Sequence, residues 1–264
     1  MALVEDTLFG RVDKVQIVID RLKAFEPPEG YYLAYSGGKD SDTILALAKM
    51  SGCKFDAHYQ LTTVDPPEVV WHIKAHPEIE IHHPEKTMWK LIVENGMPPL
   101  RQMRYCCRIL KERGGDGRTV VTGIRSAESF KRSKRRMVEN CQVAGSNKNY
   151  VNVIIDWTDA DVWEFLRGYN IPYCSLYDEG WKRLGCVCCP NANQAKQAER
   201  WPKIADGYRR ACIRACEKRI ADGKPIYGHW TNGEEMFDWW IHGQGRKYHE
   251  DKTYCDDDQS VLFE

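Results

Sequence analysis

The sequence lacks any long apolar segment. Among its 264 residues, no apolar run approaches the ~18 residues that a membrane-spanning helix needs. The opening segment, MALVEDTLFG, also lacks the basic and then apolar layout of a secretory signal. We therefore expect a cytoplasmic protein without a membrane partner.

Net charge is lacking as well, because 38 Lys and Arg residues balance 38 Asp and Glu residues. Bulk charge therefore gives no argument for binding to nucleic acid or to a membrane surface. Any electrostatic partner must be inferred from local clusters of charge. The sequence also has no internal repeat and no long low-complexity linker, which argues against an array of repeats.

A disulfide framework is not indicated, because the cysteines number eleven and no secretory signal precedes them. Five of the cysteines are scattered among apolar or helical neighbours, where cysteine most often serves as a small buried side chain. These five are Cys53, Cys141, Cys174, Cys212 and Cys216. The other six need a different explanation.

Helix and strand signals alternate over the first two-thirds of the chain, which predicts a doubly wound, mostly parallel α/β sheet. Strands are expected at 31–35, 55–61, 79–82, 119–123 and 150–155. Helices are expected at 5–25, from the serine–glycine turn to about residue 50, from the Asp65-Pro66-Pro67 turn to residue 76, at 85–95, and after Thr158. A helical stretch at 194–222, interrupted at Pro202, should form a C-terminal extension. We divide the chain into an α/β domain with the cysteine cluster, 1–190, and a helical extension with a tail, 191–264.

The segment YYLAYSGGKDS at 31–41 predicts a strand, a tight turn and the start of a helix. We call residues 36–41 the serine–glycine loop; they are Ser36, Gly37, Gly38, Lys39, Asp40 and Ser41. Two glycines let the main chain curl closely around a ligand, and the amides of the turn and of the first helical turn should converge on an anion. The loop is not a Walker loop, because the G-x-x-x-x-G-K-[ST] spacing is missing.

Four of the remaining cysteines form two pairs that are far apart in the sequence. Cys106 and Cys107 are adjacent, and Cys186 and Cys189 form a C-x-x-C pair. Two such pairs are how a protein builds a four-sulfur metal cage. An adjacent pair suits an iron–sulfur cube better than one zinc ion, because neighbouring thiolates can bind different irons. Zinc or a site without metal stays open at this point, and Cys188 is a plausible substitute ligand.

The S-G-G-x-D-S string after a strand resembles the PP-loop of the adenine-nucleotide alpha-hydrolase-like superfamily. The cysteine spacing resembles the [4Fe-4S] ligand pattern of adenylyl-sulfate and phosphoadenylyl-sulfate reductases. The segment 122–129 with Arg132 is similar to their T-G-I-R-x-x-E-S motif, and 156–180 is similar to the stretch that leads into the C-x-x-C. The resemblance implies that the serine–glycine loop binds an adenine nucleotide together with Gly123, Arg125, Glu128, Ser129 and Arg132.

The basic run from Arg125 to Arg136 contains six Lys or Arg residues against one Glu. Because the run follows the end of a strand, part of it should face the same crevice as the serine–glycine loop. We assign Arg125 and Arg132 to phosphate or sulfate. Lys134, Arg135 and Arg136 suit either a solvated surface or contact with a polynucleotide.

One part of the reductase pattern is missing. These enzymes attack the substrate with a cysteine in a C-terminal E-C-G-[LI]-H motif, whereas residues 249–258 read HEDKTYCDDD. Cys255 is the cysteine of this tail, and its acidic neighbours should raise its thiol pKa. Cys255 is therefore a weak candidate for the catalytic nucleophile.

Three functions follow from the resemblance. The leading one is reduction of adenylyl sulfate (APS) or its 3'-phosphorylated form (PAPS) to sulfite, with thioredoxin-like thiols as reductant. The second is adenylation by ATP and sulfur transfer to tRNA or DNA, in which Asp40 would face a Mg²⁺ ion. The third is a catalytically silent relative that binds nucleotide and a partner.

Overall fold

The computed structural model describes residues 3–7, 10–140, 147–226 and 230–243. A six-stranded sheet with the order β5-β4-β3-β6-β8-β7 forms its centre. Strands β3, β4, β5, β6 and β8 are parallel, and β7 pairs with β8 in the antiparallel direction. The bounds are β3 (Tyr31–Tyr35), β4 (Phe55–Gln60), β5 (Ile79–His82), β6 (Thr119–Val121), β7 (Val138–Asn140) and β8 (Asn149–Val151).

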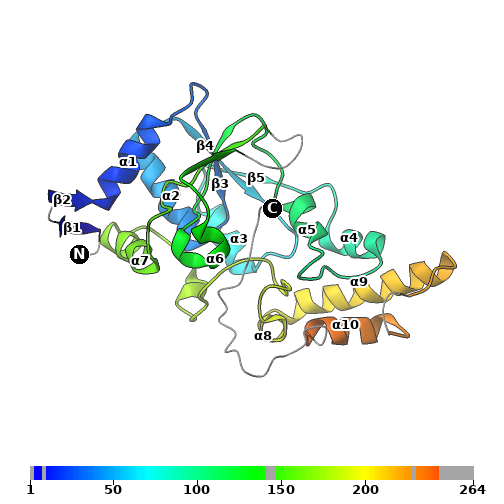
Figure 1. The fold of residues 1–264 in the computed structure, drawn as a ribbon. Helices are drawn as coiled ribbons and strands as arrows, with labels where there is room; N and C mark the ends of the chain where they lie inside the picture. Colours follow the sequence, from blue (N-terminus) through cyan, green and yellow to red (C-terminus); the bar gives the residue numbers. More distant parts are fainter. Residues whose placement is uncertain (1–2, 8–9, 141–146, 227–229, 244–264) are drawn as a thin grey trace.

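Two groups of helices stand out in the structure (Figure 1). One group, α1, α2 and α7, packs together beside the sheet, and the second, α4, α9 and α10, packs together at the other end of the molecule. The bounds are α1 (Lys14–Ala24), α2 (Lys39–Ser51), α3 (Pro67–Lys74), α4 (Met88–Asn95), α5 (Tyr105–Leu110), α6 (Phe130–Ser133), α7 (Asp159–Gly168), α8 (Gln194–Arg200), α9 (Pro202–Ala221) and α10 (Gly233–Ile241). Two single 3-10 turns are η1 (Ser126–Glu128) and η2 (Ser175–Tyr177).

The predicted fold class is confirmed: an α/β protein with a doubly wound, mostly parallel sheet and a helical C-terminal region. Chain order runs outward from β3 through β4 to β5 on one side and from β6 to β8 on the other. The strand order therefore reverses between β3 and β6, and ligands of such sheets bind outside the carboxyl ends of the strands at this switch point.

The N-terminal prediction was wrong. Residues expected to begin a helix at position 5 instead form a hairpin of β1 (Val4–Thr7) and β2 (Gly10–Asp13). Asp13 then caps α1, because its carboxylate accepts hydrogen bonds from the amides of Val15 and Gln16 at 3.0 and 3.1 Å. A capping aspartate fixes the helix start one residue later, so the helix cannot extend back into the hairpin.

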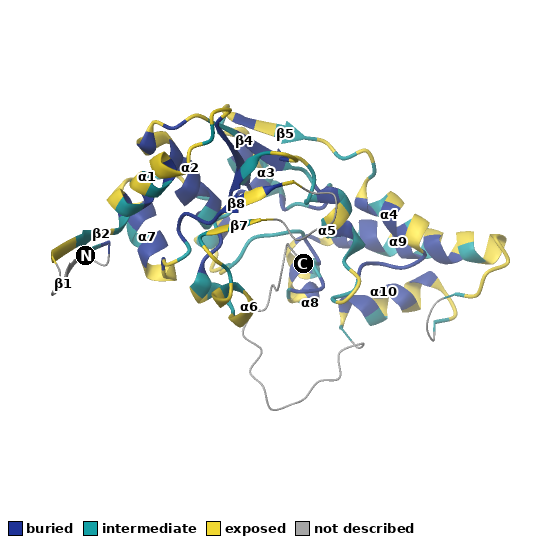
Figure 2. Ribbon diagram, turned by 45° about the horizontal axis from the view of Figure 1, so that its top comes forward, coloured by how far each residue is buried: buried dark blue, intermediate teal, exposed yellow. Residues whose placement is uncertain are grey.

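The core is built from the central strands and the helices against them. Figure 2 shows β3 and α2 buried along most of their length, whereas α9 carries both buried and exposed residues. The helical region is tied to α4, because Trp89 packs edge to face on Tyr208 and the Trp240 indole donates to the Pro99 carbonyl at 2.7 Å. Phe237, at helical spacing with Trp240, is also buried.

The boundary at residue 190 stays a prediction. No helix among the described residues is both long and apolar enough to span a bilayer. The expected cytoplasmic location also stays a prediction.

Candidate functional site

The serine–glycine loop joins β3 to α2, and the segment Thr122–Arg125 leaves the neighbouring strand β6. Both segments therefore meet at the switch point of the sheet. Gly123 allows this close approach, because a Cβ there would lie 3.0 Å from both the Cβ and the carbonyl oxygen of Asp40. Real Cβ atoms essentially never come closer than this, so a side chain at position 123 would push the two segments apart.

Two amides of the loop already have partners inside the protein. The amide of Gly38 donates to the Ser41 hydroxyl at 3.0 Å, and that hydroxyl donates back to the Gly38 carbonyl at 2.7 Å. The amide of Lys39 donates to the Tyr177 hydroxyl at 2.9 Å. These bonds hold the loop in one conformation, and a ligand that took either amide would have to displace a protein hydroxyl.

Gly37 packs against α3. Its φ of +73° lies in the left-handed region, and a Cβ there would lie 2.8 Å from Val69 Cγ1 and 3.1 Å from Ile73 Cδ1. Gly37 does not line the cavity described next. It therefore allows α3 to lie against the loop.

A cavity of about 470 Å³ opens at the switch point. This volume lies within the range of small-molecule and cofactor sites. The walls come from the serine–glycine loop, the end of β4, the segment after β6, α6 and the residues around Tyr177. Eight basic side chains line it against three acidic ones: Lys39, Lys111, Arg113, Lys131, Arg132, Lys134, Arg135 and Arg183 against Asp40, Asp65 and Glu128. This excess of positive charge suits an anionic ligand.

Beside the loop, buried cations share two carboxylates. Arg125 is 3% exposed, and its guanidinium donates to Asp40 Oδ1 at 2.7 Å and to Asp159 Oδ1 at 3.0 Å. Lys39 Nζ lies 3.0 Å from the same Asp159 oxygen and 3.5 Å from Asp40 Oδ2. Asp40 and Asp159 therefore neutralise the two cations, and Arg125 lies outside the main cavity.

Two arginines that line the cavity have less complete charge or hydrogen-bond partners than Arg125. Arg132 forms an ion pair with Glu128, yet burial and the charge of Arg183 lower its pKa to about 10. The Nε and Nη2 atoms of Arg113 are buried and have no hydrogen-bond partner within the described part of the chain. Buried polar groups normally find partners, so these two donors are unused within the described residues.

The residues of the T-G-I-R-x-x-E-S motif also shape the backbone. Glu128 accepts from the amide of Arg125 at 3.3 Å, and Ser129 caps α6 by accepting from the amide of Arg132 at 3.3 Å. These contacts hold the basic segment against the mouth of the cavity.

The four paired cysteines gather in one place. Cys106 interacts electrostatically with Cys107, Cys186 and Cys189. A hydrogen bond between the adjacent thiols raises the pKa of Cys106 and lowers the pKa of Cys107. None of the cysteines in the described ranges forms a disulfide.

The cysteines lie next to the cavity. Lys111 lines the cavity, and although burial opposes its charge, Cys186 and Asp65 raise its pKa well above the usual range. Burial raises the pKa of the Cys186 thiol to about 11, and this thiol donates to the Thr62 hydroxyl at 3.4 Å. The backbone around Cys186 is held by Val187, whose amide donates to the Val64 carbonyl at 2.8 Å.

The four sulfurs do not all converge on one point, and the Cys188 thiol has a hydrogen-bond partner of its own. No three of the four sulfurs lie within 4.8 Å of one another in the part of the chain that the structure describes. Cys188 is fully buried, with φ +56°, and its thiol donates to the Gln194 carbonyl at 3.8 Å. Burial raises its pKa to about 12.

Most of the predicted nucleotide-binding residues line the cavity: Ser36, Gly38, Lys39, Asp40, Ser41, Gly123, Glu128 and Arg132. Gly37, Arg125 and Ser129 do not. Cys255 lies outside the described residues. Sequence reasoning missed the cavity residues Arg113 and Lys111, which follow the cysteine pair, and Tyr177, which holds the Lys39 amide. Their proximity to predicted motifs was the available signal.

Comparisons with known proteins agree with this geometry. The family model "Phosphoadenosine phosphosulfate reductase domain" matches residues 30–192. An adenosine 5'-phosphosulfate reductase of Oceanobacillus iheyensis is 30% identical over 158 residues, 55% of this chain and 63% of the relative. An uncharacterized protein of Methanocaldococcus jannaschii is 28% identical over 222 residues, 75% of this chain and 45% of the relative.

Among solved structures, the phosphoadenylyl-sulfate reductase of Candida auris, a phosphate complex, has a TM-score of 0.50 at 17% identity. The match covers 65% of this chain and 87% of that one. This likeness supports the fold. The chain spans about half the length of the curated relatives it matches.

Proposed function

Because the chain belongs to the phosphoadenosine phosphosulfate reductase domain family, we propose that its cavity binds an adenine sulfonucleotide and that the protein reduces the sulfonate group to sulfite. The observation that carries this proposal is the cavity itself. It lies at the switch point of the sheet and carries eight basic side chains against three acidic ones. Such a site suits a ligand with several phosphate or sulfate oxygens.

Within the cavity, the serine–glycine loop and Gly123 would approach the phosphate, and Arg132 and Arg113 would donate to its oxygens. Arg113 has two buried nitrogens without a partner among the described residues, and an oxyanion would satisfy both. The other predicted residues would act indirectly, by holding the loop and α6 in place. Arg125 does so through its ion pair with Asp40, and Glu128 and Ser129 do so by accepting hydrogen bonds from backbone amides. Ser36 and Ser41 would supply hydroxyl donors.

The reaction would proceed in three displacement steps. A cysteine thiolate attacks the sulfonate sulfur, the bond from sulfur to the phosphate oxygen breaks, and the adenine nucleotide leaves as its phosphate. A thiol of a thioredoxin-like reductant then attacks the cysteine sulfur, sulfite leaves with the bonding pair, and a mixed disulfide joins the cysteine to the reductant. The second thiol of the reductant attacks this mixed disulfide, which frees the cysteine and leaves the reductant as a disulfide. The nucleophile stays a prediction, with Cys255 as the candidate.

The cysteine set fits an iron–sulfur cube. Zinc bound at ~2.3 Å by four thiolates would bring all four sulfurs to about 3.8 Å from one another, whereas no three of them lie within 4.8 Å of one another among the described residues. Cys106, Cys107, Cys186 and Cys189 would hold the cube. A bound cube would supply a charged metal–sulfur centre beside Lys111, which lines the cavity.

Reduction is favoured over ATP chemistry by the state of Asp40. Its two carboxylate oxygens contact Arg125 and Lys39. A Mg²⁺ ion would have to replace these cations before it could bind Asp40. A sulfonucleotide needs no such ion.

Sulfur transfer to tRNA or DNA is the second candidate, and the rim of the cavity favours it. Phe130 is 77% exposed, and Lys134 Nζ lies 4.4 Å from the centre of its ring. Exposed aromatic and cationic side chains of this kind suit stacking on bases beside phosphate contacts. Steeply salt-dependent binding of tRNA or DNA, with pyrophosphate release from ATP, would support this candidate.

The test is sulfite release from APS and from PAPS, with reduced thioredoxin and anaerobically purified protein. We expect sulfite from one of the two and four irons with four sulfides per chain. Cys186→Ser should lose the iron, and the matched control Cys188→Ser should keep it, because the Cys188 thiol faces Gln194. No sulfite from either nucleotide would refute the reductase proposal, and iron loss in both variants would refute the ligand assignment.

A further inference from the structure

A second cluster of polar side chains lies outside the cavity. Asp42 follows the serine–glycine loop in the first turn of α2, His72 lies in α3, and His76 lies two residues after its end. None of the three lines the cavity. The proposed function uses none of them, so the inference below does not depend on it.

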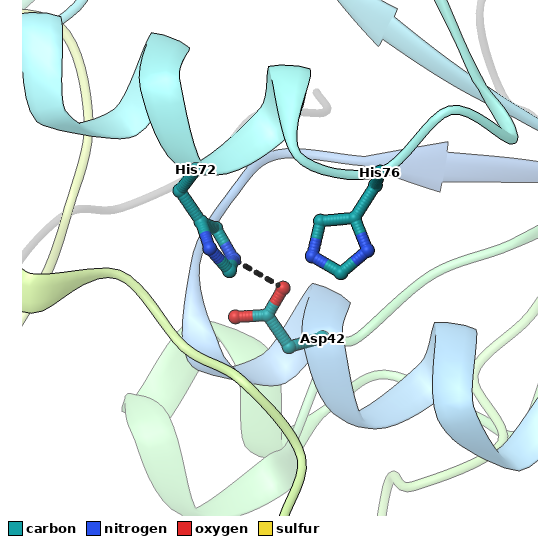
Figure 3. Close-up of side chains that lie close together, drawn as sticks. All are labelled: Asp42, His72 and His76. Carbon is teal, nitrogen blue, oxygen red and sulfur yellow. Dashed lines mark hydrogen bonds and ion pairs between the residues drawn. The ribbon is translucent and has the colours of Figure 1, made fainter.

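The three side chains converge on one point. Their ligating atoms all lie within 4.8 Å of one another. His72 Nε2 lies 2.9 Å from Asp42 Oδ1, and Figure 3 shows both imidazole rings facing the carboxylate from the α3 side. The two histidines are four residues apart, and the chain keeps turning after α3, because the His76 amide donates to the Ile73 carbonyl at 3.0 Å.

Two of the converging groups are unsatisfied. Asp42 is 2% exposed, yet its Oδ2 atom has no hydrogen-bond partner in the described chain, and the same holds for the buried Nε2 atom of His76. Leaving a buried polar group without a partner costs about 1–3 kcal/mol. A cation between the two rings and Oδ1, the carboxylate oxygen that faces them in Figure 3, would give the His76 nitrogen a partner.

One of the two histidines has a carboxylate near its second ring nitrogen. The other ring nitrogen of His76, Nδ1, lies 3.6 Å from Glu78 Oε1, and Glu78 pairs with Lys49. Tyr35 donates its hydroxyl to Asp42 Oδ1 and lies 3.2 Å from His72 Nε2. Histidines that bind metals commonly carry a carboxylate on the second nitrogen, which fixes the ring and its tautomer.

We propose that Asp42, His72 and His76 bind a divalent transition-metal ion, for which Zn²⁺ is the best match. Two imidazoles with one carboxylate form a ligand set that suits zinc, whereas Mg²⁺ and Ca²⁺ prefer oxygen ligands throughout. The ion would tie α3 to the start of α2. Because Val69 and Ile73 of α3 contact the position of Gly37, this tie also holds the serine–glycine loop.

The experiment compares full-length wild type with His72→Gln, His76→Gln and the control His83→Gln, which changes an exposed histidine. Each protein is stripped with chelator and titrated with Zn²⁺ alone by calorimetry, and bound zinc is counted by mass spectrometry. Wild type and control should bind one more zinc per chain than His76→Gln, or bind it at least 10-fold more tightly.

Zinc can also bind the cysteines, so the ligand atoms are read separately with Co²⁺. The proposed site should give ligand-field bands without thiolate-to-cobalt charge transfer, and these bands should disappear in His72→Gln and His76→Gln. If either variant does not fold, the spectrum of the wild type decides, because it must contain a cobalt site without thiolate. Equal zinc counts and affinities in all four proteins, or cobalt bound only by thiolate, would overturn the proposal.

Discussion

Substitution of Gly37 by alanine should both destabilise the protein and weaken nucleotide binding. The φ of +73° costs a residue with a Cβ about 1–2 kcal/mol. The new Cβ would lie 2.8 Å from Val69 Cγ1, and valine is stiff at χ1, so α3 must move. Overpacking of this kind costs about 1–3 kcal/mol, which gives a total loss in the free energy of unfolding of about 2–5 kcal/mol.

Gly52 offers a matched control at the other end of α2. Its φ is also +73°, but a Cβ there has nothing within 4 Å. Gly52→Ala should therefore lose only the backbone contribution of about 1–2 kcal/mol. The difference between the two variants isolates the contact between α3 and the loop.

Stability is measured by urea unfolding, and the two variants are compared only if their m-values equal that of wild type. Binding is then measured by calorimetric titration with a sulfonucleotide. Gly37→Ala should unfold at lower urea than Gly52→Ala and bind at least ~10-fold more weakly than wild type, because displacement of α3 and the loop disturbs the phosphate site. Gly52→Ala should bind like wild type. Equal stability of the two variants, or unchanged binding by Gly37→Ala, would refute the assigned role of Gly37.

Two further predictions concern charge. Burial raises the pKa of Cys188 to about 12, so the folded state holds this proton more tightly than the unfolded chain. The resulting stabilisation is complete below about pH 9, and it is lost as the pH rises toward 12. Wild type should lose about 2 kcal/mol more than Cys188→Ala between pH 8 and 10.5 in urea unfolding, and parallel pH profiles would contradict this. Asp159→Asn should bind phosphate several-fold more tightly, because Lys39 and Arg125 each lose a carboxylate at 3.0 Å. Its free energy of unfolding should fall by about 1 kcal/mol or less, because Asp159 is largely exposed. Calorimetry with inorganic phosphate measures the first effect, and weaker binding would show that Asp159 positions these cations instead.

Much of the α/β region could be predicted because its signals are local. The strand, loop and helix around 31–51 follow from an apolar run and two glycines, and α7 follows from the capping pair Thr158 and Asp161, which the structure contains. Pro202 separates α8 from α9 as predicted, since proline suits the first position of a helix.

Other features depend on contacts that no local pattern encodes. The β1–β2 hairpin has strands of only four residues, whose apolar positions also fit a helix period. The pairing of Arg125 with Asp40 and Asp159 joins three separate segments, so the sequence indicated a phosphate ligand where the structure has an internal ion pair. The spacing of His72 and His76 was a signal for a metal site, but Asp42 lies 30 residues before His72 in the sequence and meets it only in the folded chain.

The most direct test of the central claim is equilibrium binding of APS and PAPS to wild type and Arg113→Gln at fixed salt. Arg113 lines the cavity, and two of its buried nitrogens have no partner among the described residues, so loss of its charged hydrogen bonds should weaken binding by about 10- to 100-fold without loss of stability. Arg11→Gln, an exposed change outside the cavity, should bind like wild type. Equal affinity in all three proteins, or no binding by wild type, would contradict an anionic nucleotide in this cavity.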